Sequence, residues 1–258
     1  MKRIFASALI ALIAVTSCKK DDTICYDNVT MGNIEGENLI SDQGNTFDIV
    51  EATYDVILEK FEYGRVIFSC DVLRETAENR YDIRLTSIQS VLTKEPVKAS
   101  TITPDLDVAV EDPIIIRELW YGGGYINMLI QFAHLRGSEG KHLINLVYED
   151  AVATEDGMKS YTFNLHHNAY GETPNEENHL NFDPSLGYVS FPVAGLIEGD
   201  KAKITVKYNT HPLVGGHFDY LNSSEVSRTY DWERIGFQQK ASTAIRPSLM
   251  QSKSFLVR

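Results

Sequence analysis

Two histidines and an aspartate in the stretch HPLVGGHFD come closest to a metal-binding pattern. His211, His217 and Asp219 flank a Gly-Gly loop, and imidazole and carboxylate groups bind zinc or nickel. The sequence offers no second cluster at metal spacing, and a single loop of this kind is more often solvated. His166 and His167 are neighbours on an expected strand and so point to opposite faces. We therefore expect no metal and no cofactor.

Other patterns that carry chemistry are weaker still. Gly122–Gly124 is followed by a strand pattern, whereas a phosphate loop needs a helix and usually a lysine. The acidic stretches Asp105–Asp112 and Glu172–Glu177 lack the spacing of a calcium loop. The sequence contains no nucleophile elbow, HExxH or CxxC motif. A glycosidase needs only two carboxylates, so a hydrolytic enzyme stays an alternative, but we expect no catalysis.

Aromatic side chains beside the glycines are the candidate binding surface. Trp120, Tyr121 and Tyr125 could stack on sugars or contact a protein partner. The alternative is that they pack in the core, which is the more frequent position of Trp and Tyr on strands.

These residues need a β-hairpin to position them. Asp112–Phe132 contains an apolar run, three glycines, and then apolar residues at every second position, namely Ile126, Met128, Ile130 and Phe132. Period-two alternation is typical of a half-buried strand, and the glycines permit a tight reversal.

The amino terminus has the pattern of a lipoprotein signal. Residues 1–17 combine a basic start, an apolar run too short to span a bilayer as a helix, and small residues before Cys18. This resembles the signal after which lipid is attached to Cys18, whereas the alternative is an ordinary secreted protein. Lys19–Asp22 resembles the tag that sends some lipoproteins to the outer face of the outer membrane. Its alternative is a solvated tether.

Charge and cysteines limit the partners. The formal net charge of −12 repels phosphate backbones, so we expect no nucleic acid partner. Cys25 and Cys70 remain after lipidation, and an oxidising envelope permits a disulfide between them. Cys25 lies on the expected tether and Cys70 on a core-facing position, so we favour two unpaired thiols.

Strand patterns fill most of the remaining chain. Val66, Phe68, Cys70 and Val72 alternate with other residues, and Tyr81, Ile83 and Leu85 do the same. Further candidates are Leu143–Tyr148, Tyr161–Leu165, Tyr188–Pro192 and Ala202–Tyr208. We predict an all-β protein with a small barrel followed by an antiparallel β-sandwich. The predicted segments are signal 1–17, lipidated tether 18–44, barrel 45–98, linker 99–112, sandwich 113–235 and basic tail 236–258.

Four stretches of sequence carry a resemblance to a known family. They are Tyr81–Arg84 with Ser90–Lys94, Asp112–Ile114 with Trp120–Asn127, Phe163–Gly171, and Val189–Pro192. With the lipoprotein signal, they resemble the NigD-like lipoproteins of gut and oral anaerobic bacteria. The resemblance implies an OB-like amino-terminal barrel and a carboxy-terminal sandwich. It also implies a suggested link to bacteriocin immunity, but it transfers no set of functional residues.

The function expected from the sequence is therefore binding without catalysis. We expect a protein anchored to the outer membrane by lipid on Cys18, facing the cell exterior, with an unidentified protein or glycan partner. A structural accessory of an outer-membrane complex is the alternative from a different class.

Overall fold

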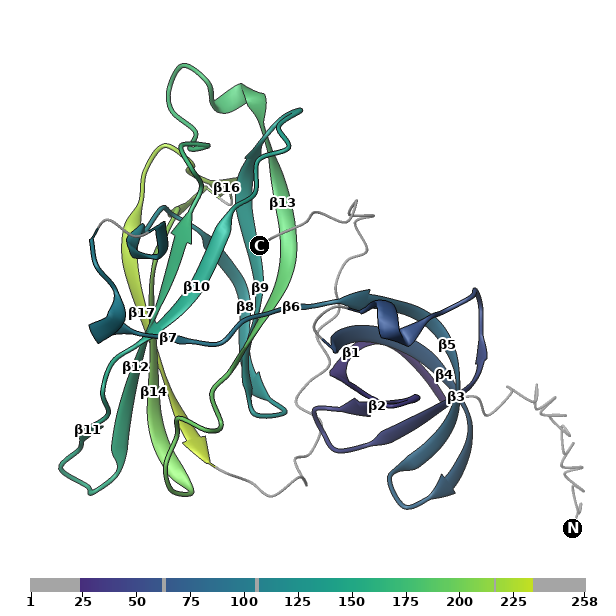
Figure 1. Cartoon of the computed structure of the whole chain (residues 1–258). Helices are drawn as coiled ribbons and strands as arrows, with labels where there is room; N and C mark the ends of the chain where they lie inside the picture. Colours follow the sequence, from purple (N-terminus) through teal and green to yellow (C-terminus); the bar gives the residue numbers. More distant parts are fainter. Residues whose placement is uncertain (1–23, 62–63, 105–106, 216, 234–258) are drawn as a thin grey trace, which may run out of the picture.

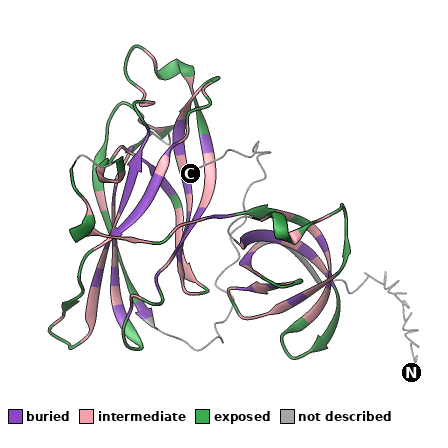
Figure 2. Ribbon diagram, viewed as in Figure 1, coloured by how far each residue is buried: buried purple, intermediate pink, exposed green. Residues whose placement is uncertain are grey.

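The computed structural model describes residues 24–61, 64–104, 107–215 and 217–233, without the side chains of 24–29 and 233. Two β units follow one another along the chain (Figure 1). Figure 2 shows that the buried residues line the inside of each unit. Among the described residues, no helix is long and apolar enough to cross a membrane.

The first unit is a closed five-stranded barrel in the order β1-β2-β3-β5-β4. Its strands are β1 (Ile24–Glu35), β2 (Asn38–Ser41), β3 (Thr46–Ala52), β4 (Arg65–Ala77) and β5 (Arg80–Ser90), with the 3-10 turn η1 (Leu58–Lys60). β3 and β5 are parallel and the other pairs antiparallel, as in an OB-like barrel. Phe47 lies against Phe68 and Tyr81 in its core, with ring centroids 5.5 and 5.7 Å away.

The expected alternation is confirmed in the barrel. Phe68, Cys70, Ile83 and Leu85 are all buried in its core. Cys70 is a free thiol, and burial raises its pKa to about 12. The side chain of Cys25 lies outside the described part of the chain, so the expectation of two unpaired thiols stays a prediction for that residue.

The barrel begins earlier than the sequence predicted. The tether was expected to run to residue 44, but β1 and β2 lie within it. Two glycines that resemble linker residues are needed for the pairing of β1 with β2. A Cβ at Gly32 would lie 2.3 Å from the Ile40 carbonyl oxygen, and Gly36 makes the β1–β2 turn at φ +63°. The signal 1–17, Cys18 and Lys19–Asp22 lie outside the described residues.

The second unit is a sandwich of two sheets. One sheet has the order β17-β14-β12-β10-β7, with β11 beside β12, and the other has the order β6-β13-β9-β8. The first comprises β7 (Val97–Lys98), β10 (Leu143–Tyr148), β11 (Val152–Ala153), β12 (Lys159–Asn168), β14 (Lys201–Thr210) and β17 (Ser224–Glu233). The second comprises β6 (Leu92–Thr93), β8 (Ile115–Gly122), β9 (Tyr125–Leu135) and β13 (Phe182–Pro192), and a small hairpin pairs β15 (Leu213–Val214) with β16 (His217–Phe218). The all-β class and the barrel–sandwich order are therefore confirmed. The prediction that the sandwich is antiparallel is wrong for one central pair, because β12 and β14 run parallel.

The central hairpin is formed as predicted. β8 and β9 are antiparallel, with Gly122 opposite Tyr125. Met128 and Ile130 are 0% and 1% exposed, so the predicted register of β9 is correct. The four later strand candidates lie in β10, β12, β13 and β14.

The segment that leaves the barrel belongs to the sandwich from the start. β6 pairs in parallel with β13, and β7 pairs in parallel with β10. The predicted linker 99–112 also packs on the sandwich. It contains the 3-10 turns η2 (Ala99–Thr101) and η3 (Asp107–Ala109), and the Asp112 N–H donates to the His167 carbonyl at 2.7 Å. Prolines in this segment interrupt the hydrogen bonding between strands, which is why its sequence resembled a linker. The basic tail 236–258 lies outside the described residues.

Candidate functional site

The three aromatic residues of the predicted binding surface lie in three different environments. Trp120 packs against the buried cluster that contains Met31 at the barrel–sandwich junction. Tyr121 packs against the sandwich core and contacts Trp232 edge-to-face, with centroids 5.6 Å apart. Tyr125 lies under the guanidinium of Arg65, 3.9 Å from its ring centroid. The structure therefore brings Trp120 and Tyr125 to the domain junction rather than to an open platform.

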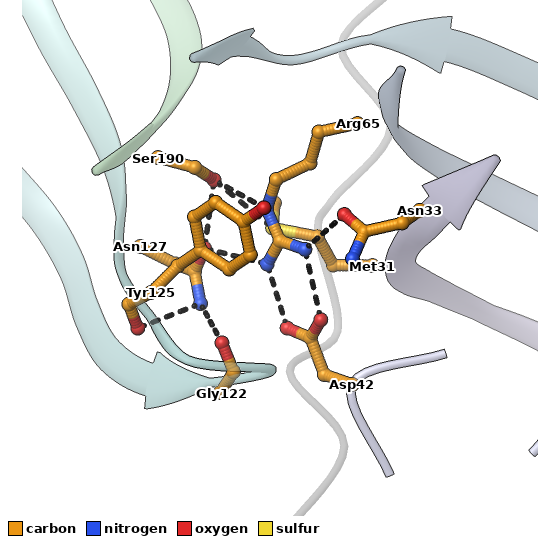
Figure 3. A network of polar contacts seen from close by, with 8 residues as sticks. All are labelled: Met31, Asn33, Asp42, Arg65, Gly122, Tyr125, Asn127 and Ser190. Atoms are coloured by element: carbon orange, nitrogen blue, oxygen red, sulfur yellow. Dashed lines mark hydrogen bonds and ion pairs between the residues drawn. The ribbon is translucent and has the colours of Figure 1, made fainter. Parts of the chain in front are cut away.

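Arg65 joins the barrel to the sandwich (Figure 3). It begins β4 and is 1% exposed. Its five N–H groups have acceptors in both units. These are Asp42 Oδ1 and Oδ2 (2.9 and 2.8 Å), Asn33 Oδ1 (3.0 Å), Asn127 Oδ1 (2.8 Å) and Ser190 Oγ (2.9 Å). Ser190 in turn donates to Asn127 Oδ1 at 2.7 Å.

The glycine hairpin is shaped to receive this ion pair. A Cβ at Gly123 would lie 2.3 Å from Asp42 Oδ1, and a Cβ at Gly122 would lie 2.8 Å from Asp42 Oδ2. Burial raises the pKa of Asp42, and the hydrogen bonds and charge of Arg65 oppose that rise. A fully bonded buried pair of this kind fixes geometry at large desolvation cost. We conclude that it orients the two units and is not itself a site for a ligand.

A pocket of about 240 Å³ lies at the opposite end of β9 from the glycine turn, next to the loop before β13. Its lining is mostly apolar or aromatic and includes Pro174, Phe182, Pro184, Phe218, Tyr220 and Leu221. The Tyr220 hydroxyl accepts a hydrogen bond from Gln131 Nε2 at 2.6 Å, which attaches this loop to the sheet. Large apolar side chains on the same loops are exposed, with Leu180 at 76% and Leu213 at 63%.

Two carboxylates border this pocket, and both are held in the ionised form. The pKa of Asp183 is lowered by its hydrogen bonds from Arg136, and that of Asp219 by its hydrogen bond from Asn222. A general acid requires the opposite shift. The pocket therefore combines apolar walls with the Asp219 carboxylate and with an Asp183–Arg136 ion pair.

A second polar group lies at the same end of the sandwich, between its sheets. His134, His142 and Glu172 each offer one ligand atom, and these atoms lie within 4.8 Å of one another. His134 is near the end of β9, His142 precedes β10, and Glu172 follows β12. Among the described residues, this is the group with metal-ligand spacing. Sequence reasoning missed it because the three residues are separated by loops and follow no local motif.

The histidines that sequence reasoning considered are arranged differently. His211 Nδ1 binds the Asn222 carbonyl at 2.9 Å, while His217 is exposed on β16. Asp219 accepts from the Leu221 N–H at 3.0 Å. His166 contacts the Val108 carbonyl, and its neighbour on β12 points into the sandwich. His211, Asp219 and His166 therefore bond to nearby backbone groups, and the structure does not gather His211, His217 and Asp219 into a metal site.

Comparison with known proteins identifies the second unit. Residues 96–220 match the family described as "NigD-like C-terminal beta sandwich domain". The sandwich is a NigD-like domain. This confirms the resemblance found in the sequence and assigns the predicted linker to the domain. No curated protein matches the chain.

Solved structures extend the likeness of fold over both units. A protein of unknown function from Bacteroides vulgatus has a TM-score of 0.58 and 17% identity, covering 87% of this chain and 96% of its own. A protein described as a NigD-like immunity protein from Bacteroides caccae has a TM-score of 0.58 and 19% identity, covering 81% of this chain and 97% of its own. These likenesses concern the fold alone.

Proposed function

We propose that this NigD-like protein is a lipid-anchored, non-catalytic binding protein of the bacterial outer membrane. Its partner would be a cationic peptide or protein with apolar side chains. The observation that carries the proposal is the pocket at the far end of the sandwich, whose walls include Phe182, Phe218 and Leu221. At about 240 Å³ it is smaller than a usual small-molecule site. Its size suits a side chain of a larger partner.

Charge supports a cationic partner. The chain has a formal net charge of −12, and Asp219 borders the pocket together with Asp183, which pairs with Arg136. Such a field attracts cations and accelerates their association. Exposed Leu180 and Leu213 beside these aspartates suit a partner that combines basic and apolar residues. The lowered pKa values of both aspartates support binding over acid–base catalysis.

The position of the pocket supports a location far from the membrane, where a partner could reach it. Lipid on Cys18 would leave only five residues before β1 begins at Ile24, a span of at most roughly 20 Å. The barrel would then stay close to the bilayer. β9 runs for 11 residues from the glycine turn at the barrel to the pocket, a distance of roughly 35 Å. This arrangement is the basis for proposing that the pocket faces the cell exterior.

The immunity description of one structural neighbour adds a specific form of the proposal. The cationic partner would be an antibacterial peptide, and binding it at the surface would protect the cell. Cationic peptides with apolar faces have the chemistry that this pocket suits.

Calorimetric titration of the soluble chain from Lys19 tests the proposal. The probes are a short synthetic peptide of alternating lysine and leucine and a matched peptide of glutamate and leucine. We expect only the lysine peptide to bind. Leu221→Ser should weaken binding about tenfold or more, because burying a leucine contributes about 1.5–3 kcal/mol.

Val152→Ser is the matched control, since Val152 is 66% exposed on β11, away from the pocket. Equal binding of the two peptides, or equal effects of the two substitutions, would refute the proposal.

A further inference from the structure

The surrounding backbone determines which ring nitrogen carries the hydrogen in the histidines at the pocket end of the sandwich. His167 Nδ1 lies 3.3 and 3.2 Å from the carbonyls of Asp112 and Pro113. Carbonyls only accept, so this nitrogen carries the hydrogen and His167 Nε2 presents a lone pair. Burial lowers the pKa of His167 to about 3, which keeps the ring neutral.

The next histidine must then point a lone pair at a carboxylate. His142 Nδ1 lies 2.8 Å from His167 Nε2 and donates to it, which leaves His142 Nε2 without a hydrogen while the ring is neutral. That nitrogen is buried and has no hydrogen-bond partner among the described residues. Its nearest charged neighbour is Glu172 Oε2 at 3.6 Å. Two electron-rich atoms face each other here, and a cation bound between them would stabilise the arrangement.

His134 completes the same centre. Its Nε2 lies 3.2 Å from the Ser138 carbonyl and therefore carries the hydrogen, and its Nδ1 lies 3.5 Å from Glu172 Oε2. Burial alone would raise the pKa of Glu172, but hydrogen bonds from the Ser138 hydroxyl and the Leu135 N–H contribute to lowering it. The carboxylate is thus held ionised at the point where two imidazole nitrogens converge.

We propose that His134 Nδ1, His142 Nε2 and Glu172 Oε2 form a binding site for a divalent transition-metal ion, with Zn²⁺ the best match. Ligand atoms around tetrahedral zinc are separated by roughly 3.3–3.5 Å, given metal–ligand distances of about 2.0–2.2 Å. The separations of 3.5 and 3.6 Å to Glu172 Oε2 fit this geometry with little movement. Two histidines and one carboxylate leave one coordination position open.

The surrounding contacts are those that support metal ligands. Each histidine donates its other N–H, one to the Ser138 carbonyl and one to His167, and the Ser138 hydroxyl donates to Glu172 Oε1. Such outer contacts fix the tautomer and orientation of ligands. Gly140 leaves the necessary room, because a Cβ there would lie 2.2 Å from Glu172 Oε1.

Metal binding would join three segments that are otherwise linked by loops. The ion would tie the end of β9 and the start of β10 to the segment after β12. That last segment continues into the pocket, whose lining includes Pro174 and His179. The site would therefore hold one wall of the pocket in place. The inference concerns metal binding alone, so it stands apart from the peptide proposal.

Titration of the chain from Lys19 with Zn²⁺, and with Co²⁺ as a coloured substitute, tests the site. The protein is first treated with EDTA, and it carries Cys25→Ser so that this thiol cannot bind the added metal. We expect one ion per chain, a visible Co²⁺ spectrum of tetrahedral type that Zn²⁺ abolishes, and a higher Tm with Zn²⁺.

Glu172→Gln should weaken Zn²⁺ binding at least tenfold and abolish the rise in Tm. Gly140→Ala should also weaken it, because it displaces the carboxylate without removing it. His217→Gln, at an exposed histidine, is the matched control and should bind as the parent does. Circular dichroism in EDTA shows whether each variant is folded. Failure of the folded parent to bind Zn²⁺, or equal binding by Glu172→Gln and His217→Gln, would overturn the site.

Discussion

Replacing Arg65 by methionine tests the contact between the barrel and the sandwich. Methionine retains much of the apolar stem but none of the five N–H donors. The change leaves the Asp42 carboxylate, with a side chain 6% exposed, without its cation. Asn127 and Ser190, both 0% exposed, lose a charged donor at the same time.

The expected cost follows from this burial. Removing one partner of a buried ion pair costs about 3–5 kcal/mol, because the remaining charge is left without compensation. The separate hydrogen bonds belong to one network and do not add to that figure independently. With a urea m-value of about 2–3 kcal/mol/M, the unfolding midpoint should fall by roughly 1–2 M.

Urea unfolding of the chain from Lys19, followed by tryptophan fluorescence and circular dichroism, measures this effect. Arg84→Met is the matched control, because Arg84 is 41% exposed and pairs with Glu51 at 2.7 Å. Exposed pairs contribute about 0–1 kcal/mol. Equal midpoint shifts for the two variants would refute the claim that Arg65 holds the units together.

The Arg65→Met variant should also gain a pH dependence. Burial raises the pKa of Asp42, and Arg65 opposes the rise. Without Arg65, the folded pKa rises further above the unfolded value of about 3.9. The folded state of the variant then binds the proton more readily than the unfolded state. The loss of stability relative to the parent is therefore full above the folded pKa of Asp42, and it shrinks as the pH falls through that pKa towards about 4. Urea titrations over this range would show a constant deficit if Asp42 were not the cause.

Three further predictions concern the hairpin and the cores. Gly123→Ala should cost more stability in urea unfolding than Gly36→Ala. Both glycines have φ near +60°, but only a Cβ at Gly123 would contact Asp42, so equal losses would contradict that contact. Met128→Asp should cost about 4 kcal/mol or more, since an unpaired charge would enter a 0% exposed position; a tolerated change would mean that β9 has another register. The Cys70 thiol, with its pKa raised to about 12, should react with a thiol reagent in a Cys25→Ser chain only after unfolding, and rapid labelling of the folded chain would contradict its burial.

The sequence predicted the sheet-forming parts of the fold well, because period-two burial is a local signal. Met128 and Ile130 in β9 and Cys70 in β4 are buried as their alternation indicated. The start of the barrel was placed too late, since Gly32 resembled a linker glycine. Its role in the close approach of β1 to β2 depends on the pairing between strands.

The candidate sites were less predictable because they depend on distant contacts. Arg65 and Ser190 are 125 positions apart in sequence and 2.9 Å apart in space. Neither residue belongs to a motif with a recognised chemical role. His142 and Glu172 meet only when β10 pairs with β12, and His134 on β9 joins them only once the two sheets have packed. Glu172 was considered only as part of an acidic stretch and Gly123 only as part of a turn, whereas both face residues distant in sequence.

Hydrogen exchange of the soluble chain with and without the lysine–leucine peptide tests the binding proposal most directly. We predict added protection at Pro174–Pro184 and Phe218–Leu221, the segments that line the pocket, with little change in the barrel. Protection confined to the barrel strands, with none at the pocket, would contradict the account.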